Sequence, residues 1–483
     1  MADLTFHHGS RVFESEETPV LVRIAKTAVV GLIGTAPDAD ETKFPLNRPV
    51  QLLRPSDASG LGAAGTLKDA VDSIFDQIVC PIVLVRVEPG TTTAETWAHA
   101  IGDATAYSGV HAFRRAVSDG LYKPKLLLAP GLTQSAPADG VASIAVGVAG
   151  TGYTEAGTTV SLARGTGDTT GTGATAQAIV GDNGAITAIV VTKPGYGYTT
   201  APTVTITGPS GASGATATAA VGSTMNPVVA ELIGVAEKLK AVAYVDGPDT
   251  SDQAAVQYRG LINSDRIFVC DPKVLKFDTA TALNVPKPSS PIFAGRQAKM
   301  DAERGFWWAG SNVPAAGITG VNRPVEYGEQ ADYLNVSRIN TIVNIENSGF
   351  RLWGVWTCAS DLLWQFVSVR RTADAINEAV EKAYLDFVDR PFSKANLKFL
   401  VEAGRAFLKT LEREGAILPG SECWLLDTNS NEDMAQGIVK LGIRFEPPAP
   451  MVDIRITAYR NIAAYTLLLD QVAQEIDAGA LAA

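Results

Sequence analysis

Residues 27–36 read TAVVGLIGTA, a run of small and apolar residues that carries no charge. This composition is typical of a strand that is buried on both faces of a parallel sheet. Two more such runs occur at 82–87 and 125–129, and the segment 66–78 has apolar residues at helical spacing. The alternation of strands and helices predicts an α/β layer with helices on both faces of the sheet.

The same alternation returns in a later part of the chain. Predicted helices and strands follow one another over four ranges: 227–239, 241–245, 250–263 and 266–270. Because the two stretches have the same architecture, we predict one discontinuous α/β domain formed by residues 26–135 and 226–340.

A Gly/Thr/Ala-rich block, residues 136–225, separates the two stretches and contains a degenerate tandem repeat. The repeated pieces are Gly150–Thr154 and Gly195–Thr199, Val160–Leu162 and Val204–Ile206, and Gly173–Ala176 and Gly214–Ala217. Short alternating strands between glycine and proline turns predict a small inserted all-β domain, and disorder is the alternative. Insertions are tolerated best at exposed loops, so we expect the block to lie on the outer surface and to tolerate deletion.

The C-terminal third predicts a second body over residues 341–450. Strand-like runs at 341–345 and 350–353 precede two amphipathic helices. Their apolar stripes are Ala373, Ile376, Ala379, Val380, Ala383 and Phe387, and then Leu397, Leu400, Val401, Gly404, Leu408 and Leu411. Glu378 and Lys382, four residues apart, are expected to pair on the polar side of the first helix.

Strand-like pieces also lie at both ends of the chain, outside these bodies. Those of the N-terminal arm, residues 1–25, contain Arg11, Val12, Phe13, Val20 and Val22. In the C-terminal arm, residues 451–483, Ile454 and Ile456 alternate with polar residues, as in a half-buried strand. Two-stranded units of this size are marginally stable alone, so both arms are expected to need partner strands.

Residue usage gives no indication of an enzyme, a cofactor site or a metal site. The formal net charge of −11 argues against nucleic acid or an anionic membrane as a partner. The four cysteines and four histidines lack the spacings of metal sites, and Gly31–Gly34 lacks the G-K-[ST] ending of a phosphate loop. No secretory signal opens the chain and no run of about 20 apolar residues could span a bilayer, so folding in the cytoplasm is expected.

Several ordered motifs resemble those of one protein family. The matching segments are 7–9, 27–36, 44–50, 301–308, 311–313, 317–321, 350–354, 357–358, 369–372 and 454–457. Among them, 350–354 (FRLWG) and 369–372 (VRRT) are the most specific. They are similar to the contractile tail sheath proteins of P2-like phages and R-type pyocins, and the similarity extends over the whole chain except the insert.

The resemblance implies a multidomain α/β (α+β) sheath fold with extended N- and C-terminal arms. It implies a homo-oligomer of hexameric rings, stacked helically around a tail tube protein and in contact with baseplate and tail terminator proteins. The arms would donate strands to neighbouring subunits, and contraction would drive the tube through the host envelope. Such a protein belongs to the virion tail, is assembled in the bacterial cytoplasm, and neither contacts nucleic acid directly nor inserts into a membrane.

The resemblance also implies that the helices at 373–388 and 396–414 face the tube. The candidate tube-facing residues are Glu378, Lys382, Lys398, Arg405 and Lys409. Two other classes of protein are alternatives: a surface adhesin or decoration protein that binds through the β-repeats, and an enzyme on an α/β scaffold. Within the sheath class, the sequence does not separate a phage from a pyocin or another contractile injection system.

Overall fold

The computed structural model describes residues 26–346 and 348–481. The chain divides into two compact units, residues 1–449 and 450–483. Five of the predicted arm residues, Arg11, Val12, Phe13, Val20 and Val22, lie outside the described residues.

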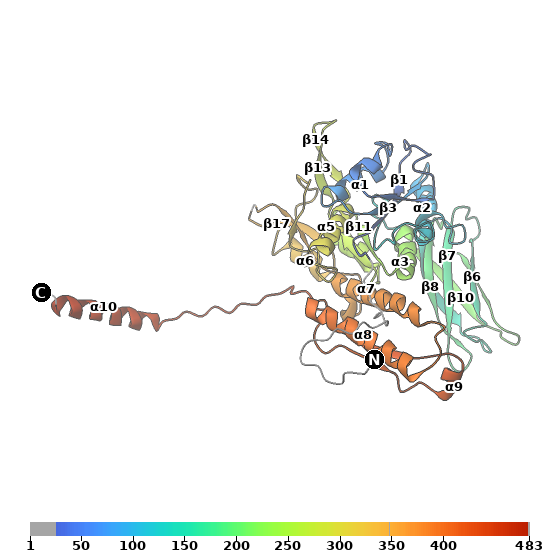
Figure 1. The fold of residues 1–483 in the computed structure, drawn as a ribbon. Coiled ribbons are helices and arrows are strands. Elements are labelled where there is room, and N and C mark those ends of the chain that lie inside the picture. Colours follow the sequence, from blue (N-terminus) through green and yellow to red (C-terminus); the bar gives the residue numbers. More distant parts are fainter. Residues whose placement is uncertain (1–25, 347, 482–483) are drawn as a thin grey trace, which may run out of the picture. The chain divides into compact units, whose positions relative to one another are not determined.

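The first unit is built on a six-stranded sheet with β1 (Val30–Thr35) near its centre (Figure 1). The strand order is β12 (Ile267–Cys270), β11 (Val242–Asp246), β4 (Leu126–Leu128), β1, β3 (Ile82–Val87) and β2 (Pro49–Leu52). All neighbours pair in parallel except β2, which is antiparallel to β3. Every residue of β1 is buried, so the prediction of a doubly covered strand at 27–36 is confirmed.

Helices cover both faces of this sheet. Along β1, Leu32 joins the core beneath α1 (Leu67–Phe75) and α5 (Ser290–Glu303), whereas Ile33 joins the core on the opposite face. That opposite face is covered by α2 (Thr93–Ile101), the 3-10 helix η2 (Gly109–Arg115), α3 (Pro227–Leu239) and α4 (Asp252–Gly260). Successive side chains of a strand point to opposite faces, which is why one apolar strand supplies two cores.

The inserted block folds as a six-stranded antiparallel sheet. Its strands are β5 (Gly140–Val148), β6 (Thr159–Ala163), β7 (Thr172–Val180), β8 (Ile186–Tyr196), β9 (Thr203–Thr207) and β10 (Thr216–Gly222), in the order β10-β5-β8-β7-β6-β9. The prediction of an inserted small all-β domain is confirmed, and its strands enclose their own apolar core.

The two sequence repeats are related by a pseudo-twofold arrangement within the insert. Ile144 of the first repeat pairs with Ile189 of the second across β5 and β8. The hydroxyl of Tyr198 accepts a hydrogen bond from the amide of Ala174 (3.3 Å). The hydroxyl of Tyr153, its equivalent in the first repeat, accepts one from Ala215 (3.4 Å). Each repeat therefore makes backbone and side-chain contacts that hold the other repeat in place.

Smaller elements complete the α/β part of the unit. They are η1 (Pro55–Ala58), β13 (Val274–Asp278), β14 (Leu283–Lys287), β15 (Val313–Pro314), β16 (Gly320–Val321), α6 (Gln330–Val336), β17 (Thr341–Asn344) and β18 (Phe350–Trp353). Ile342 and Leu352 of β17 and β18 are fully buried in the core of the parallel sheet. We predicted a domain boundary after residue 340, but β17 and β18 lie beyond it and still pack against the core of the parallel sheet.

A helical hairpin follows, after η3 (Leu362–Trp364). It consists of α7 (Val367–Tyr384), the short η4 (Leu385–Phe387) and α8 (Lys394–Glu414), and α8 ends at Gly415 with a left-handed φ of 79°. The predicted apolar stripes meet here, because Ile376, Ala379, Leu408 and Leu411 share one core. β19 (Glu422–Leu425) and β20 (Leu441–Arg444) pack on the hairpin, and α9 (Asn431–Ala435) lies between them in the chain.

The second unit begins at Pro450 and contains α10 (Ala464–Leu481). The strand predicted around Ile454 and Ile456 is not formed within the described chain, and these side chains are 71% and 85% exposed. A strand needs a partner edge for its backbone groups, and none of the described segments supplies one here. No helix among residues 26–346 and 348–481 is both long and apolar enough to cross a membrane.

Candidate assembly surfaces

The helix α7 lies across the amino-terminal ends of the parallel strands. Lys125 precedes β4 and pairs with Glu378 of α7, and Lys123 does the same at 2.6 Å. Arg266 precedes β12 and pairs with Asp374, while Lys240 precedes β11 and pairs with Glu381 of α7 (2.5 Å). Ion pairs between α7 and three strand ends therefore join the helical hairpin to the sheet.

Another ion pair of α7 is buried and joins this helix to α5. The carboxylate of Asp301 is 1% exposed and receives two hydrogen bonds from Arg371, which is 5% exposed. Burial lowers the pKa of Arg371, but the Asp301 carboxylate outweighs it and the pKa rises above its ordinary value. Burial likewise lowers the pKa of Lys125, to about 8, against the opposing effect of Glu378. Loss of one partner would leave an uncompensated buried charge.

Glu378 of α7 faces Lys123 and Lys125 with a side chain only 15% exposed, so within the subunit it holds the helix on the sheet; its place on a tube-facing surface stays a prediction. The expected pair with Lys382 is wrong, because Glu378 is engaged by the two strand-end lysines, while Lys382 is exposed. Burial raises the pKa of Glu378, but hydrogen bonds from Lys123 and Lys125 lower it overall.

The other candidate residues lie on the outward side of α8. Lys398 is exposed, and the side chains of Arg405 and Lys409 are 53% and 66% exposed. With Lys394 and Arg413 they form a basic stripe of positions 394, 398, 405, 409 and 413, interrupted by Glu402 and Glu412. Arg405 also donates to the carbonyl of Cys423 (2.9 Å), which fixes the stripe to β19. We call this surface the α8 stripe.

The hairpin of β19 and β20 has no third strand along either edge among the described residues, although Arg405 occupies the Cys423 carbonyl of β19. Its strands pair only with each other among the described residues, with Cys423 opposite Ile443. The side chains of these two residues pack on the core shared by α7 and α8, so the hairpin is held rigidly although it is short. Unpaired edge groups of a sheet are a template for the addition of another strand.

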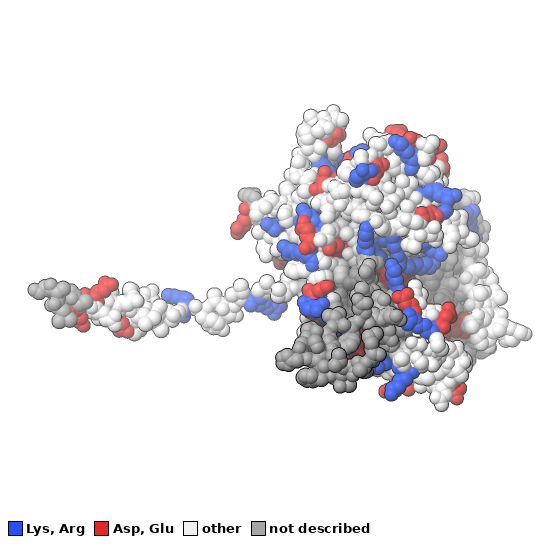
Figure 2. Space-filling model, in the orientation of Figure 1, with Lys and Arg blue, Asp and Glu red and all other residues white. Residues whose placement is uncertain are grey.

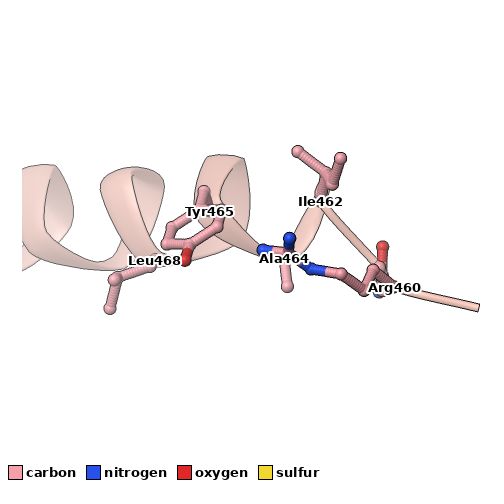
Figure 3. Close-up of a pocket in the computed structure, with 6 residues that line it drawn as sticks. Arg460, Ile462, Ala464, Tyr465 and Leu468 are labelled. Atoms are coloured by element: carbon pink, nitrogen blue, oxygen red, sulfur yellow. The ribbon is translucent and has the colours of Figure 1, made fainter.

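The C-terminal unit exposes a long apolar surface. A hollow of about 390 Å³ is lined only by residues between Arg460 and Leu468. Figure 3 shows Tyr465 and Leu468 extending from the first turns of α10, with Ile462 on the preceding segment. All walls of this hollow come from one stretch of chain, so it is an open surface of the segment and not an enclosed ligand site.

Charged groups elsewhere do not form a metal site in the part of the chain that the structure describes. Groups of three or more potential metal ligands do not occur there. The four cysteines are buried, and burial raises the pKa of Cys80 and of Cys358 to about 12. Figure 2 shows Lys and Arg side chains interspersed with Asp and Glu on the visible face.

Comparison with known proteins identifies the family. The chain matches the phage tail sheath protein central domain over residues 215–358 and the phage tail sheath C-terminal domain over residues 359–460. It is 30% identical to the tail sheath protein of Burkholderia phage BcepMu, over 95% of this chain and 98% of that protein. The chain belongs to the phage tail sheath family. The family boundary at residues 358 and 359 places β17 and β18 with the central domain, as their packing does.

Other tail sheath relatives agree with this assignment. The tail sheath protein of Escherichia phage P2 is 26% identical, over 93% of this chain and 94% of its own length. Among solved structures, the anti-feeding prophage helical sheath in the contracted state matches with a TM-score of 0.58 and 17% identity, over 95% of this chain and 100% of that chain. The extracellular contractile injection system PVC sheath has a TM-score of 0.57 and 15% identity, over 95% and 99%. At 15–17% identity these structures show only that the fold is shared. The family membership identifies this chain as a structural component of a tail and does not favour the adhesin alternative.

Proposed function

We propose that this tail sheath protein polymerises as stacked hexameric rings around an inner tail tube and contracts to drive the tube through the host envelope. It acts as a structural protein and not as an enzyme, and it is assembled in the host bacterial cytoplasm into the virion tail. One observation carries the proposal: the same chain has an open-edged hairpin and an extended apolar segment without a strand partner among the described residues.

The first supporting step concerns the C-terminal arm. Residues 451–460 are extended, and Met451, Ile454, Ile456 and Tyr459 are between 71% and 88% exposed. Ten residues of extended chain span up to about 35 Å, which is enough to reach another subunit. Pairing with the β19–β20 hairpin of a neighbour would satisfy the backbone groups of both and bury these side chains.

The second step concerns movement. The buried ion pairs of α7 join the hairpin and the sheet into one body, so subunits would rotate as rigid units during contraction while the arms stay paired. The α8 stripe is proposed to contact the tail tube protein, with Lys398, Arg405 and Lys409 as contacts and Lys382 of α7 beside them. A basic stripe requires an acidic tube surface. Baseplate and tail terminator proteins would bind the two ends of the sheath.

An assembly experiment with strand-face variants tests the arm. Replacing Ile454 and Ile456 with serine removes the apolar side of the segment, and the expected result is loss of striated tubes in negative-stain electron microscopy. The matched control replaces Asp453 and Arg455, which lie on the opposite side of the same segment and pair with each other at 2.8 Å. The control should assemble. Tubes of normal length from the Ile454/Ile456 variant would refute the arm contact.

A further inference from the structure

A crevice opens at the carboxyl-terminal edge of the parallel sheet, where the strand order reverses. β1 has β3 on one side and β4 on the other, so the loops that leave β1 and β4 diverge between them. Open parallel sheets bind ligands at this topological switch point. The hydroxyl of Thr66 accepts a hydrogen bond from the amide of Thr35 (3.2 Å), which holds the segment before α1 against the end of β1, and Gly131 follows β4.

The crevice contains a cavity of about 220 Å³. Its polar walls come from three parts of the fold: Thr66 and Asp69 of the α1 region, Gln134 after β4, and Lys273 and Lys287 beside the β13–β14 pair. At about 30 Å³ per water, the cavity holds roughly seven waters. It therefore has room for a phosphate group with its hydration or for a small ester, and it is too small for a dinucleotide.

Several polar groups in and beside this cavity lack partners. Lys287 pairs with Asp69, so these two charges compensate each other. The ammonium of Lys273 lines the cavity without an ion pair to any described residue, and its positive charge also acts on the buried carboxylate of Asp246, which does not line the cavity. The carbonyl oxygen of the Gln134 side chain is buried without a hydrogen-bond partner among the described residues. The hydroxyl of Ser289, in a residue 1% exposed beside the lining segment, is unpaired in the same way.

These groups specify the chemistry of a ligand. A buried acceptor without a partner is unfavourable, so a donor is favoured near Gln134, while the ammonium of Lys273 favours an anion. We propose that the crevice binds a phosphate group that carries a proton, as hydrogen phosphate or as a small phosphomonoester. Its oxygens accept from Lys273 and its P–OH donates to Gln134. The bound group would contact the segment before α1, the loop after β4 and the β13–β14 pair. Because it would bind only the folded chain, it should stabilise the single subunit even without sheath assembly.

Titration calorimetry of the full-length protein tests the site at constant ionic strength and at pH 6, where inorganic phosphate and about half of a phosphomonoester carry a P–OH. Inorganic phosphate should bind in the millimolar range or tighter and raise the melting temperature. Lys273→Gln should weaken binding at least tenfold. Lys299→Gln is the matched control, because Lys299 pairs with Glu303 (3.7 Å) on α5 and does not line the cavity. Equal losses in the two variants, or no binding to the natural chain, would overturn the proposal.

Two further measurements keep the result interpretable. Sulfate has the same shape but no proton at this pH, so it should bind several-fold more weakly. Gln134→Met should abolish this preference while leaving a folded protein, as judged by circular dichroism. Glycerol phosphate in a parallel titration distinguishes an ester from the free ion as the better ligand. Equal affinity of the natural chain for sulfate and phosphate would contradict the assigned role of Gln134.

Discussion

One side chain of the inserted domain, Tyr196, packs into the core of the α/β body, and we predict that it contributes to the stability of that body. Tyr196 lies at the end of β8, is 8% exposed, and belongs to the core beneath α2 and α3. Its ring packs edge-on against Trp97, with 5.8 Å between ring centroids and 76° between planes. We therefore expect Tyr196→Ala to destabilise the α/β body and not only the insert.

The magnitude follows from the burial. Truncation of a buried large aromatic residue to alanine costs about 3–5 kcal/mol, of which the aromatic pair contributes about 0.5–1.5 kcal/mol. The hydroxyl bond to the carbonyl of Ala94 is long, 3.4 Å, so Tyr196→Phe should cost less than about 1 kcal/mol. For a body of this size the alanine variant should melt on the order of 5–10 °C lower.

The sequence repeat supplies the control. Thr151 occupies the position of Tyr196 in the first repeat, but its side chain is exposed, so Thr151→Ala should change stability by less than about 0.5 kcal/mol. Differential scanning calorimetry of both variants makes the comparison, with tryptophan fluorescence reporting on Trp97. Equal melting temperatures for Tyr196→Ala and the natural chain would refute the reasoning. Because Tyr196 belongs to the core of the α/β body, the insert should not tolerate deletion as the sequence suggested. Replacing residues 137–224 with a linker should destabilise the α/β body.

Three other outcomes follow. Burial raises the pKa of Glu231, but hydrogen bonds from the neighbouring imidazole and lysine bring it to about 2. As the pH falls, this carboxylate takes up its proton near pH 4.5 in the unfolded chain but only near pH 2 in the folded chain, so its contribution to the free energy of unfolding is lost between these two values. Glu231→Gln should therefore lower the free energy of unfolding by roughly 3 kcal/mol above pH 4.5. In urea titrations, the free energy of unfolding of the variant should also change less between pH 4.5 and pH 2 than that of the natural chain. Arg371→Met leaves Asp301 buried and unpaired and should cost about 3–5 kcal/mol in the same assay, and a loss below 1 kcal/mol would refute a role for the pair. Charge reversal of Lys398 should weaken co-sedimentation with the tail tube protein at an unchanged melting temperature, whereas Lys409 is kept because it pairs with Glu412 (2.7 Å). Retained binding would argue against the α8 stripe as the contact.

The parallel sheet could be predicted from sequence because its strands have a local signal. A strand buried on both faces must be apolar throughout, and 27–36 and 82–87 are. The helix α5 has no such signal, since it is buried on nearly all sides and includes Arg296 and Gln297. Gln297 is accommodated by hydrogen bonds to Asp301 (2.9 Å) and to the carbonyl of Trp308 (2.9 Å). A helix that is buried on nearly all sides has no separate apolar and polar faces, so helical spacing does not reveal it.

Partners that are distant in sequence or on another subunit cannot be found from local spacing. Glu378 meets Lys123 across 255 residues, and a helix considered alone offers only Lys382 as its partner. Ile454 and Ile456 alternate as a strand does, but the pattern does not say which chain provides the neighbouring strand. Lys398, Arg405 and Lys409 are exposed as expected, because helical spacing identifies an outward face without any long-range partner.

A reconstruction of tubes assembled from the purified chain by cryo-electron microscopy tests the central claim most directly. The proposed function predicts that residues 451–460 of one subunit form a strand along the β19–β20 hairpin of another subunit in the wall of a hollow tube. A map in which residues 451–460 pair within their own chain, or in which both edges of every hairpin stay open, would contradict it.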